Sequence, residues 1–368
     1  MRKVSLTKQK RNLWIAIAVI LLAAIVISGT LFGVFYHRYG VRPTVTASAQ
    51  NVILLIGDGM GPDHVKAASL QRDLSMESVK KTGFVTTRSL TPVGFTDSAA
   101  AATAMATGSK TYNGRISYYN GQNLQNLGEY VKELGLKFGV ITTKSVTDAT
   151  PAAFTSHSKS RDDDDAIARQ QIFEADCDVL FGLGKEYYAP YADQIETESR
   201  AYITSYDELL KNKKDQVYAT FDTDRIPSGG SFTLASLTDR ALDMLSNEKG
   251  FFLMVEGAKI DSYSHDNDID NMIEELIAFD NAVQVALTYA EANPNTTVIV
   301  TADHETGNLR LPKNPTPDDL QDKYFRRSYH SGRDVRYWIQ GPGASEIPET
   351  IDNTDIYYII RQLLTKNG

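Results

Sequence analysis

The sequence predicts an α/β protein in which a mostly parallel sheet is covered by helices on both faces. Three observations support this prediction: short apolar runs that are continuous rather than alternating, helix-forming stretches between them, and an ordinary globular composition with 42% hydrophobic and 23% charged residues. Continuous apolar runs are typical of strands buried on both faces. Their alternation with helices is typical of a parallel sheet.

The chain begins with the pattern of a membrane anchor. A basic tail, residues 1–12, precedes 24 uncharged residues, 13–36, which suffice for a transmembrane helix. The positive-inside rule places the tail in the cytoplasm and the remainder outside. We therefore expect a single-pass protein of the cell membrane with an extracytoplasmic body, joined through a linker at residues 37–50. The alternative is a secreted protein, cleaved near Ala49 in an A-x-A triplet.

The body, residues 51–368, contains the predicted sheet. Apolar runs predict strands at residues 51–56, 138–142, 251–255, 297–301 and 335–339. The stretches between them predict helices at residues 98–107, 124–134, 165–175, 234–246, 269–291 and 354–364. The tracts 185–231 and 311–327 are polar, with several tyrosines and prolines, and we expect them to be surface excursions.

Charge and cysteine content narrow the classes of function. Beyond residue 42 the chain has 31 basic and 46 acidic side chains, a net charge of −15. A nucleic-acid partner would favour a basic face, so we expect none. The single cysteine, Cys177, excludes an intrachain disulfide and a thiolate zinc cluster. Histidines and carboxylates would therefore have to hold any metal, and an acidic body favours divalent cations.

Acidic residues and a histidine follow the predicted strands where each strand ends. In chain order these residues are Asp58, Asp148, Glu256, Asp303 and His304. In open α/β sheets, ligands bind beyond the carboxyl ends of the strands, so we expect these side chains to converge at one edge. Converging carboxylates repel one another unless cations compensate them. The sequence therefore predicts a metal site at this edge.

Further histidines fit such a site. Asp261 and His265 are spaced i and i+4, so one helical turn can present both to one ion, and zinc accepts such donors. His330 lies in a polar, glycine-containing turn near a strand. His64, in contrast, is expected at the surface, and His157 is expected to form a hydrogen bond behind the ligands.

Ser98 is the candidate nucleophile. It begins an alanine-rich helix directly after Asp97, which is a favourable N-cap residue. A hydroxyl there lies at the positive end of the helix dipole, which suits an attack on phosphorus or the binding of a phosphate oxygen. The alternative is that Ser98 only caps the helix while the alanines pack against the sheet.

Taken together, six segments resemble the alkaline phosphatase family. They follow the family order and read LLIGDGMG (54–61), TDSAAAATAMATGSKTYNG (96–114), DATPAAFTSHSKSR (148–161), VEGAKIDSYSH (255–265), TADHETG (301–307) and HSG (330–332). The resemblance covers nearly the whole body. It implies a three-layer α/β/α sandwich, hydrolysis of phosphate monoesters at a site with two zinc ions and one magnesium ion, and a homodimer.

The resemblance also implies a role for each candidate residue. The first zinc site would comprise Asp261, His265 and His330, and the second Asp58, Asp303 and His304. The magnesium site would comprise Asp58, Asp148, Thr150 and Glu256. Ser98 matches the family nucleophile, which forms a phosphoserine, and Arg161 matches the arginine that binds phosphate. Ser262 stands where some bacterial members have Lys, Trp or His, so we expect looser binding of the phosphate product and an altered metal preference.

Two alternative functions remain. One is a phosphodiesterase on the same metal site, but related diesterases often use Thr as nucleophile and lack the arginine, whereas this chain has Ser98 and Arg161. The other is a catalytically silent, metal-binding surface module. Pseudoenzymes usually lose a ligand or the nucleophile, and here every expected position is filled.

Overall fold

The computed structural model describes residues 42–365. The basic tail, the predicted membrane-spanning segment 13–36 and the first part of the predicted linker lie outside these residues. Among residues 42–365, no helix combines the length and the apolarity that a membrane span needs. From Pro43 onward the described chain packs as one compact unit.

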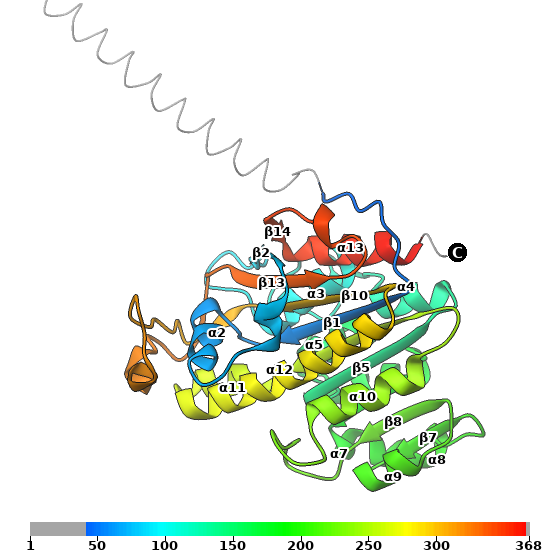
Figure 1. Ribbon diagram of the computed structural model, residues 1–368. Coiled ribbons are helices and arrows are strands. Elements are labelled where there is room, and N and C mark those ends of the chain that lie inside the picture. The colour runs from blue at the N-terminus through cyan, green and yellow to red at the C-terminus, as the bar shows by residue number, and fades with distance from the viewer. Residues whose placement is uncertain (1–41, 366–368) are drawn as a thin grey trace, which may run out of the picture. The chain divides into compact units, whose positions relative to one another are not determined.

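A ten-stranded sheet forms the centre of this unit (Figure 1). Across the sheet the strands are β14 (Thr350–Asp352), β2 (Lys81–Thr86), β13 (Val335–Gln340), β10 (Thr296–Ala302), β1 (Asn51–Gly57), β9 (Phe251–Gly257), β5 (Lys137–Ser145), β6 (Val179–Leu183), β8 (Gln216–Thr220) and β7 (Arg200–Ile203). Strand β13 pairs antiparallel with both neighbours, and the other pairings in this sheet are parallel. Two small antiparallel sheets of two strands join β3 (Tyr118–Tyr119) to β4 (Gln122–Asn123) and β11 (Glu305–Thr306) to β12 (His330–Ser331).

Helices cover the sheet in two layers. One layer contains α2 (Pro62–Ser69), α10 (Leu234–Leu245), α11 (Lys259–His265) and α12 (Ile269–Ala292). The other contains α3 (Ser98–Thr107), α4 (Leu127–Glu133), α5 (Ala149–Thr155), α6 (Asp164–Phe173) and α13 (Asn353–Thr365). The described residues thus form the mostly parallel sheet between helices that the sequence predicts.

The central strands and α3 show why these residues adopt these elements. All seven residues of β1 are buried, as expected for an apolar strand with neighbours on both sides. All ten residues of α3 are buried as well, because its alanines allow close packing against α5 and α13. The side chain of Asp97 caps the helix by accepting a hydrogen bond from the Ala100 N–H, and Gly108 ends it in a left-handed conformation.

The prediction for the tract 185–231 was wrong in part. This tract contains β7 and β8, which extend the central sheet, and three short helices, α7 (Lys185–Tyr188), α8 (Ala192–Ile195) and α9 (Tyr206–Lys211). The strands escaped detection because they are short and polar in sequence, and because tyrosines supply part of their core: Tyr188 and Tyr218 are fully buried. The tract 311–327 contains only 3-10 turns, as expected for a surface excursion.

The second half of the predicted linker packs onto the body. Residues 43–50 run extended beside α13, where the Val45 N–H donates to Gln362 Oε1 at 2.9 Å and the Ala49 N–H to the Leu363 carbonyl at 2.9 Å. The side chains of Val45 and Ala49 are buried. This stretch therefore belongs structurally to the sheet-containing unit.

Candidate functional site

Three adjacent strands end level with one another at the candidate site. In the register of the sheet, Gly57 at the end of β1 lies beside Ala302 of β10 and Gly257 of β9. Asp58 follows Gly57, and Asp303 and His304 follow Ala302. The turn after β1 requires glycine, because Gly59 has a φ of +72° and a Cβ there would lie 2.9 Å from the Asp261 Cα. The Gly59 N–H donates to Asp303 Oδ1 at 3.1 Å, which fixes that carboxylate.

One group of donors comprises Asp261, His265 and His330, as the sequence predicts. Helix α11 carries the first two residues one turn apart, and β12 carries the third. The two imidazole Nε2 atoms lie 3.2 Å apart. Asp261 Oδ1 lies 3.4 Å from His265 Nε2 and 3.6 Å from His330 Nε2. One oxygen and two nitrogens thus face a common point.

A second group comprises Asp58, Asp303 and His304, and all three side chains are buried. His304 Nε2 lies 3.2 Å from Asp303 Oδ2 and 3.5 Å from Asp58 Oδ1. The ring of His304 stacks on that of His330, with centroids 3.7 Å apart, so the two groups adjoin. In each group the donor atoms lie within 4.8 Å of one another.

The hydrogen bonds of the imidazoles fix which ring nitrogen faces the site. His265 Nδ1 donates to the Ser328 carbonyl and His330 Nδ1 to the Thr96 carbonyl, each at 2.7 Å. His304 Nδ1 lies 3.3 Å from the Thr306 hydroxyl. Because Nδ1 carries the proton in a neutral ring bonded in this way, Nε2 presents a lone pair. Two lone pairs 3.2 Å apart repel each other, and a cation between them removes that repulsion.

The electrostatics of the second group also favour a cation. Burial, reinforced by the neighbouring Asp303 and Asp261 carboxylates, raises the pKa of Asp58 well above its usual range. Burial raises the pKa of Asp303 to about 6 and lowers the pKa of His304 to about 4. Buried carboxylates beside neutral histidines are stable as anions only when positive charge compensates them.

The donor set fits metal binding on a further observation. Asp303 Oδ2 is buried and accepts no hydrogen bond from the described residues, although it lies 3.2 Å from His304 Nε2. Both atoms would be satisfied by one ion. Mixed nitrogen and oxygen donors of this kind suit zinc.

Ser98 lies beside the second group. Its hydroxyl oxygen is 3.2 Å from His304 Nε2 and 3.5 Å from Asp58 Oδ1, and the residue is only 4% exposed. Asp97 caps helix α3, so Ser98 is free of that role and occupies the first helical position. The capping alternative is therefore wrong, and the hydroxyl faces both the donor group and the positive end of the helix.

Arg161 contacts Asp148 and also Asp97, the residue that precedes Ser98. Arg161 Nη2 is 3.0 Å from Asp148 Oδ1, and Nη1 is 3.5 Å from Asp97 Oδ2. Asp148 also faces Lys144, whose Nζ lies 3.7 Å from Oδ2. Despite its burial, these cations hold the pKa of Asp148 below its usual range, Lys144 more strongly than Arg161. Arg161 is thus part of the site and not a solvated surface residue.

The predicted magnesium ligands are less closely gathered. In the part of the chain that the structure describes, Asp58, Asp148 and Glu256 do not converge within 4.8 Å as the other two groups do. Glu256 is buried and accepts a hydrogen bond from the Thr142 hydroxyl, and burial raises its pKa to about 7. Thr150 Oγ1 is buried without a hydrogen bond of normal geometry. Oxygen donors of this type suit a hard cation.

Two supporting residues escaped the sequence analysis. The Thr306 hydroxyl donates to Asp261 Oδ1 at 2.6 Å and so links the two donor groups. His64, expected at the surface, is fully buried on α2, and its Nε2 lies 3.0 Å from the Ser264 hydroxyl behind α11. Its polar neighbours in sequence conceal this burial. The position of Thr306 two residues after His304 was the only sequence signal for its role.

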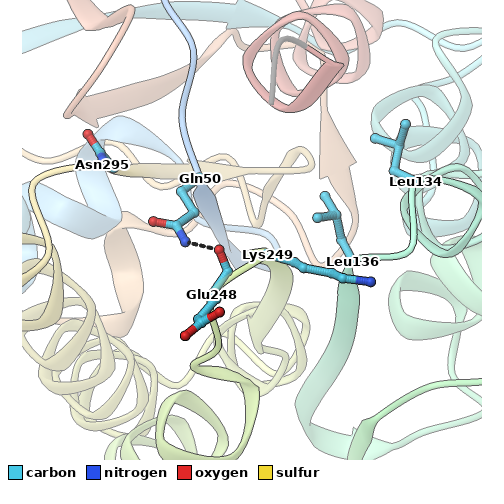
Figure 2. Close-up of a pocket in the computed structure, with 6 residues that line it drawn as sticks. All are labelled: Gln50, Leu134, Leu136, Glu248, Lys249 and Asn295. Atoms are coloured by element: carbon cyan, nitrogen blue, oxygen red, sulfur yellow. Dashed lines mark hydrogen bonds between the residues drawn. The ribbon is translucent and has the colours of Figure 1, made fainter. Parts of the chain in front are cut away.

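Two hollows differ in their relation to this site. A cavity of about 530 Å³, shown in Figure 2, is lined by Gln50, Leu134, Leu136, Glu248, Lys249 and Asn295. Most of these residues immediately precede β1, β5, β9 and β10, so this cavity lies at the amino ends of the strands, opposite the donor groups. A smaller hollow of about 320 Å³ is lined in part by Thr96, whose carbonyl bonds to His330, and by Ser331, the residue after His330. This hollow therefore lies beside the site.

Comparison with known proteins gives consistent matches. Residues 49–312 match the family model for alkaline phosphatase. Alkaline phosphatase 4 of Bacillus subtilis (strain 168) is 36% identical over 299 residues, which cover 73% of this chain and 64% of that protein. The match thus spans slightly less than two thirds of that relative. The alkaline phosphatase of Escherichia coli (strain K12) is 30% identical over 410 residues, which cover 86% of each chain.

Solved structures of similar proteins share the fold. A cold-active alkaline phosphatase from a psychrophilic Shewanella species superimposes with a TM-score of 0.79 at 30% identity, covering 85% of this chain and 99% of that one. The alkaline phosphatase of the Antarctic bacterium TAB5 gives a TM-score of 0.75 at 29% identity, covering 87% and 98%. A variant of the TAB5 enzyme has been solved with magnesium in a site named M3.

Proposed function

The chain belongs to the alkaline phosphatase family, and on this premise we propose that it hydrolyses phosphate monoesters to an alcohol and inorganic phosphate. One observation carries the proposal. The Ser98 hydroxyl lies 3.2 Å from His304 Nε2, at the start of a helix and beside two adjoining groups of metal donors. A nucleophile, a positive helix end and cation sites then share one edge of the sheet.

Two zinc ions and one magnesium ion are the proposed cofactors. Asp261, His265 and His330 would hold one zinc, and Asp58, Asp303 and His304 the other. Asp58, Asp148, Thr150 and Glu256 would supply oxygen donors for magnesium, in keeping with the magnesium bound in the TAB5 variant. Bound in these places, the cations would lower the pKa of the Ser98 hydroxyl and neutralise charge on the attacking and leaving oxygens.

In the proposed reaction Ser98 attacks phosphorus. A bond forms between Ser98 Oγ and phosphorus while the bond from phosphorus to the alcohol oxygen breaks. The proton lost from Ser98 Oγ passes to solvent, and solvent returns one to the departing oxygen, which leaves as the alcohol. The resulting phosphoserine is then hydrolysed by water, which restores the hydroxyl and releases phosphate. The first turn of α3 supports this step, because its N–H groups favour negative charge.

Arg161 is the proposed phosphate-binding residue. Its guanidinium can donate two parallel hydrogen bonds to non-bridging phosphate oxygens. Asp97 and Asp148 hold it from the side, at 3.5 Å and 3.0 Å, which limits the rotamers that it must search before binding. A positioned fork of this kind lowers the entropy lost when phosphate is bound.

We also propose the topology that the sequence suggests. Residues 13–36 would anchor the protein in the cell membrane, with the catalytic domain, residues 51–368, outside the cytoplasm. The burial of Val45 and Ala49 against the body supports retention of this segment over cleavage near Ala49. Carbonate extraction and protease protection of the intact chain would test the anchor.

Homodimerisation follows from the family resemblance alone, and light scattering would test it.

The experiment that tests the proposed function compares two substrates. We would measure steady-state hydrolysis of p-nitrophenyl phosphate and of its bis ester by the zinc- and magnesium-loaded protein, by chelated protein and by Ser98→Ala. We expect monoester turnover that both chelation and the serine substitution abolish. A preference for the bis ester would indicate a phosphodiesterase, and absence of turnover by folded, metal-loaded protein would indicate a silent binding module.

A further inference from the structure

Lys144 is a cation near the site that the residue pattern did not single out. It lies near the carboxyl end of β5, where the pairing register with β6 shifts between Ile141 and Ser145. Its backbone N–H donates to Thr142 Oγ1 at 3.1 Å, and the Thr142 hydroxyl donates to Glu256. Lys144 Nζ lies 3.7 Å from Asp148 Oδ2, and its side chain is 24% exposed. The ammonium group therefore faces the site and is only partly solvated.

Lys144 completes a balanced cluster of charges. Asp148 lies between two cations, with Oδ1 bound to Arg161 and Oδ2 facing Lys144. Arg161 in turn faces a second carboxylate, Asp97. Without Lys144, one guanidinium would face two carboxylates, and this trio would have a net negative charge where the phosphate dianion is proposed to bind. With Lys144 included, the total charge of Asp97, Asp148, Arg161 and Lys144 is zero.

Lys144 is attracted by other carboxylates of the site as well as by Asp148: despite its burial, Asp58, Asp148, Asp261 and Glu256 raise its pKa. It also lines a hollow of about 580 Å³ that contains Lys185 and Asp222. Those two residues pair with each other at 2.6 Å. Among residues 42–365, Asp148 is the carboxylate with which Lys144 forms an ion pair within 4 Å.

We propose that Lys144 is a positioning residue that supplies, from β5, the positive charge beside Asp148 and thereby strengthens phosphate binding by Arg161 while weakening magnesium binding. The inference rests on the proposed function. It also revises the expectation of looser phosphate binding that we drew from Ser262. Ser262 is uncharged, but Lys144 supplies Asp148 with a partner cation. Because the charge of Lys144 offsets that of Asp148, more of the positive charge of Arg161 is available to a phosphate oxygen.

The two effects of Lys144 have opposite signs, which makes them distinguishable from structural damage. A nearby ammonium attracts an anion and repels a cation. Loss of this charge is therefore expected to weaken phosphate binding and to strengthen magnesium binding. A general loosening of the site would weaken both.

The test measures binding directly on the full chain in detergent, loaded with zinc. Isothermal titration with inorganic phosphate and, separately, with Mg²⁺ would compare wild type, Lys144→Gln, Lys144→Arg and Lys185→Gln. Lys144→Gln should raise the phosphate Kd about tenfold and lower the Mg²⁺ Kd severalfold, as one unit charge at short range predicts. Lys144→Arg should retain both affinities, and Lys185→Gln, from the same hollow, should change neither.

Several results would overturn the inference. An unchanged phosphate Kd in Lys144→Gln, or a loss of both affinities at an unchanged melting temperature, would assign Lys144 no such role. If Lys144→Gln failed to fold, a phosphate Kd for Lys144→Arg as weak as that of Arg161→Lys would also overturn it. Wild-type protein that binds phosphate but does not turn over the monoester would contradict the proposed function and leave the comparison of variants intact.

Discussion

Thr306 Oγ1 donates a hydrogen bond to Asp261 Oδ1 at 2.6 Å and lies 3.3 Å from His304 Nδ1. One hydroxyl therefore contacts a donor of each proposed zinc group. It fixes the orientation of the carboxylate and holds the imidazole in the tautomer that presents Nε2 to the site. Residues behind metal ligands often contribute to affinity in this way.

Replacement of Thr306 by valine should weaken zinc binding. Valine preserves the shape of the side chain but removes the hydroxyl, so we expect zinc affinity to fall about 10- to 100-fold, as for other residues behind metal ligands. Competition with a fluorescent chelator would measure the affinity. Thr238→Val is a matched control, because among the described residues the Thr238 hydroxyl bonds only to the Leu234 carbonyl within α10. Equal zinc affinity in Thr306→Val and wild type would refute the role given to Thr306.

Arg161→Lys should impair the use of phosphate substrates. Lysine keeps the charge but loses the fork, so we expect kcat/KM for p-nitrophenyl phosphate to fall about tenfold or more. Steady-state kinetics would measure the loss. Arg169→Lys serves as the control and should retain activity. Arg169 lies on α6 and donates a hydrogen bond to the Tyr191 hydroxyl. A kcat/KM unchanged by Arg161→Lys would contradict direct contact with phosphate.

Asp58→Asn should have opposite effects on stability with and without metal. In the metal-free protein the substitution removes one of several buried, mutually repelling carboxylates, so we expect a higher melting temperature than for metal-free wild type. In the metal-loaded protein it removes a ligand and should lower the melting temperature. Scanning calorimetry of chelated and metal-loaded samples would measure both. A lower melting temperature in both forms would show that charge repulsion does not dominate at this position.

Glu275, away from the site on α12, should make stability depend on pH. Burial raises its pKa to about 7. Because the folded pKa lies above the ordinary value, the protonated group's contribution to stability is fully present below about pH 4.5 and is lost as the pH rises through 7. Glu275→Gln should therefore increase the free energy of unfolding at pH 8 by roughly 1 to 3 kcal/mol and have little effect at pH 4.5. Urea denaturation at both pH values would measure this.

The neighbouring Glu274 provides the control for that measurement. Its side chain is 56% exposed, so Glu274→Gln should leave the pH dependence unchanged. An equal gain from Glu275→Gln at both pH values would mean that the side chain acts through packing and not through its charge.

Much of the fold and the donor groups could be predicted, because the signals are local. The runs that became β1, β5, β9 and β10 are continuous in apolar residues, and the predicted ligands Asp58, Asp303 and His304 follow them directly. Strands β7 and β8 could not be predicted, since their burial depends on neighbours that the chain supplies elsewhere. Lys144 and Thr306 were missed for the same reason: the partners Asp148 and Asp261 are recognisable only in the fold.

The position of Ser98 between the donor groups and Arg161 is the central claim, and trapping its intermediate would test it most directly. Metal-loaded protein would be mixed with excess monoester, quenched in acid within one turnover and digested, and the phosphorylated peptide identified by mass spectrometry. We predict phosphate on Ser98 in wild type and none in Ser98→Ala. Phosphate on another residue, or turnover that persists in Ser98→Ala, would contradict the account.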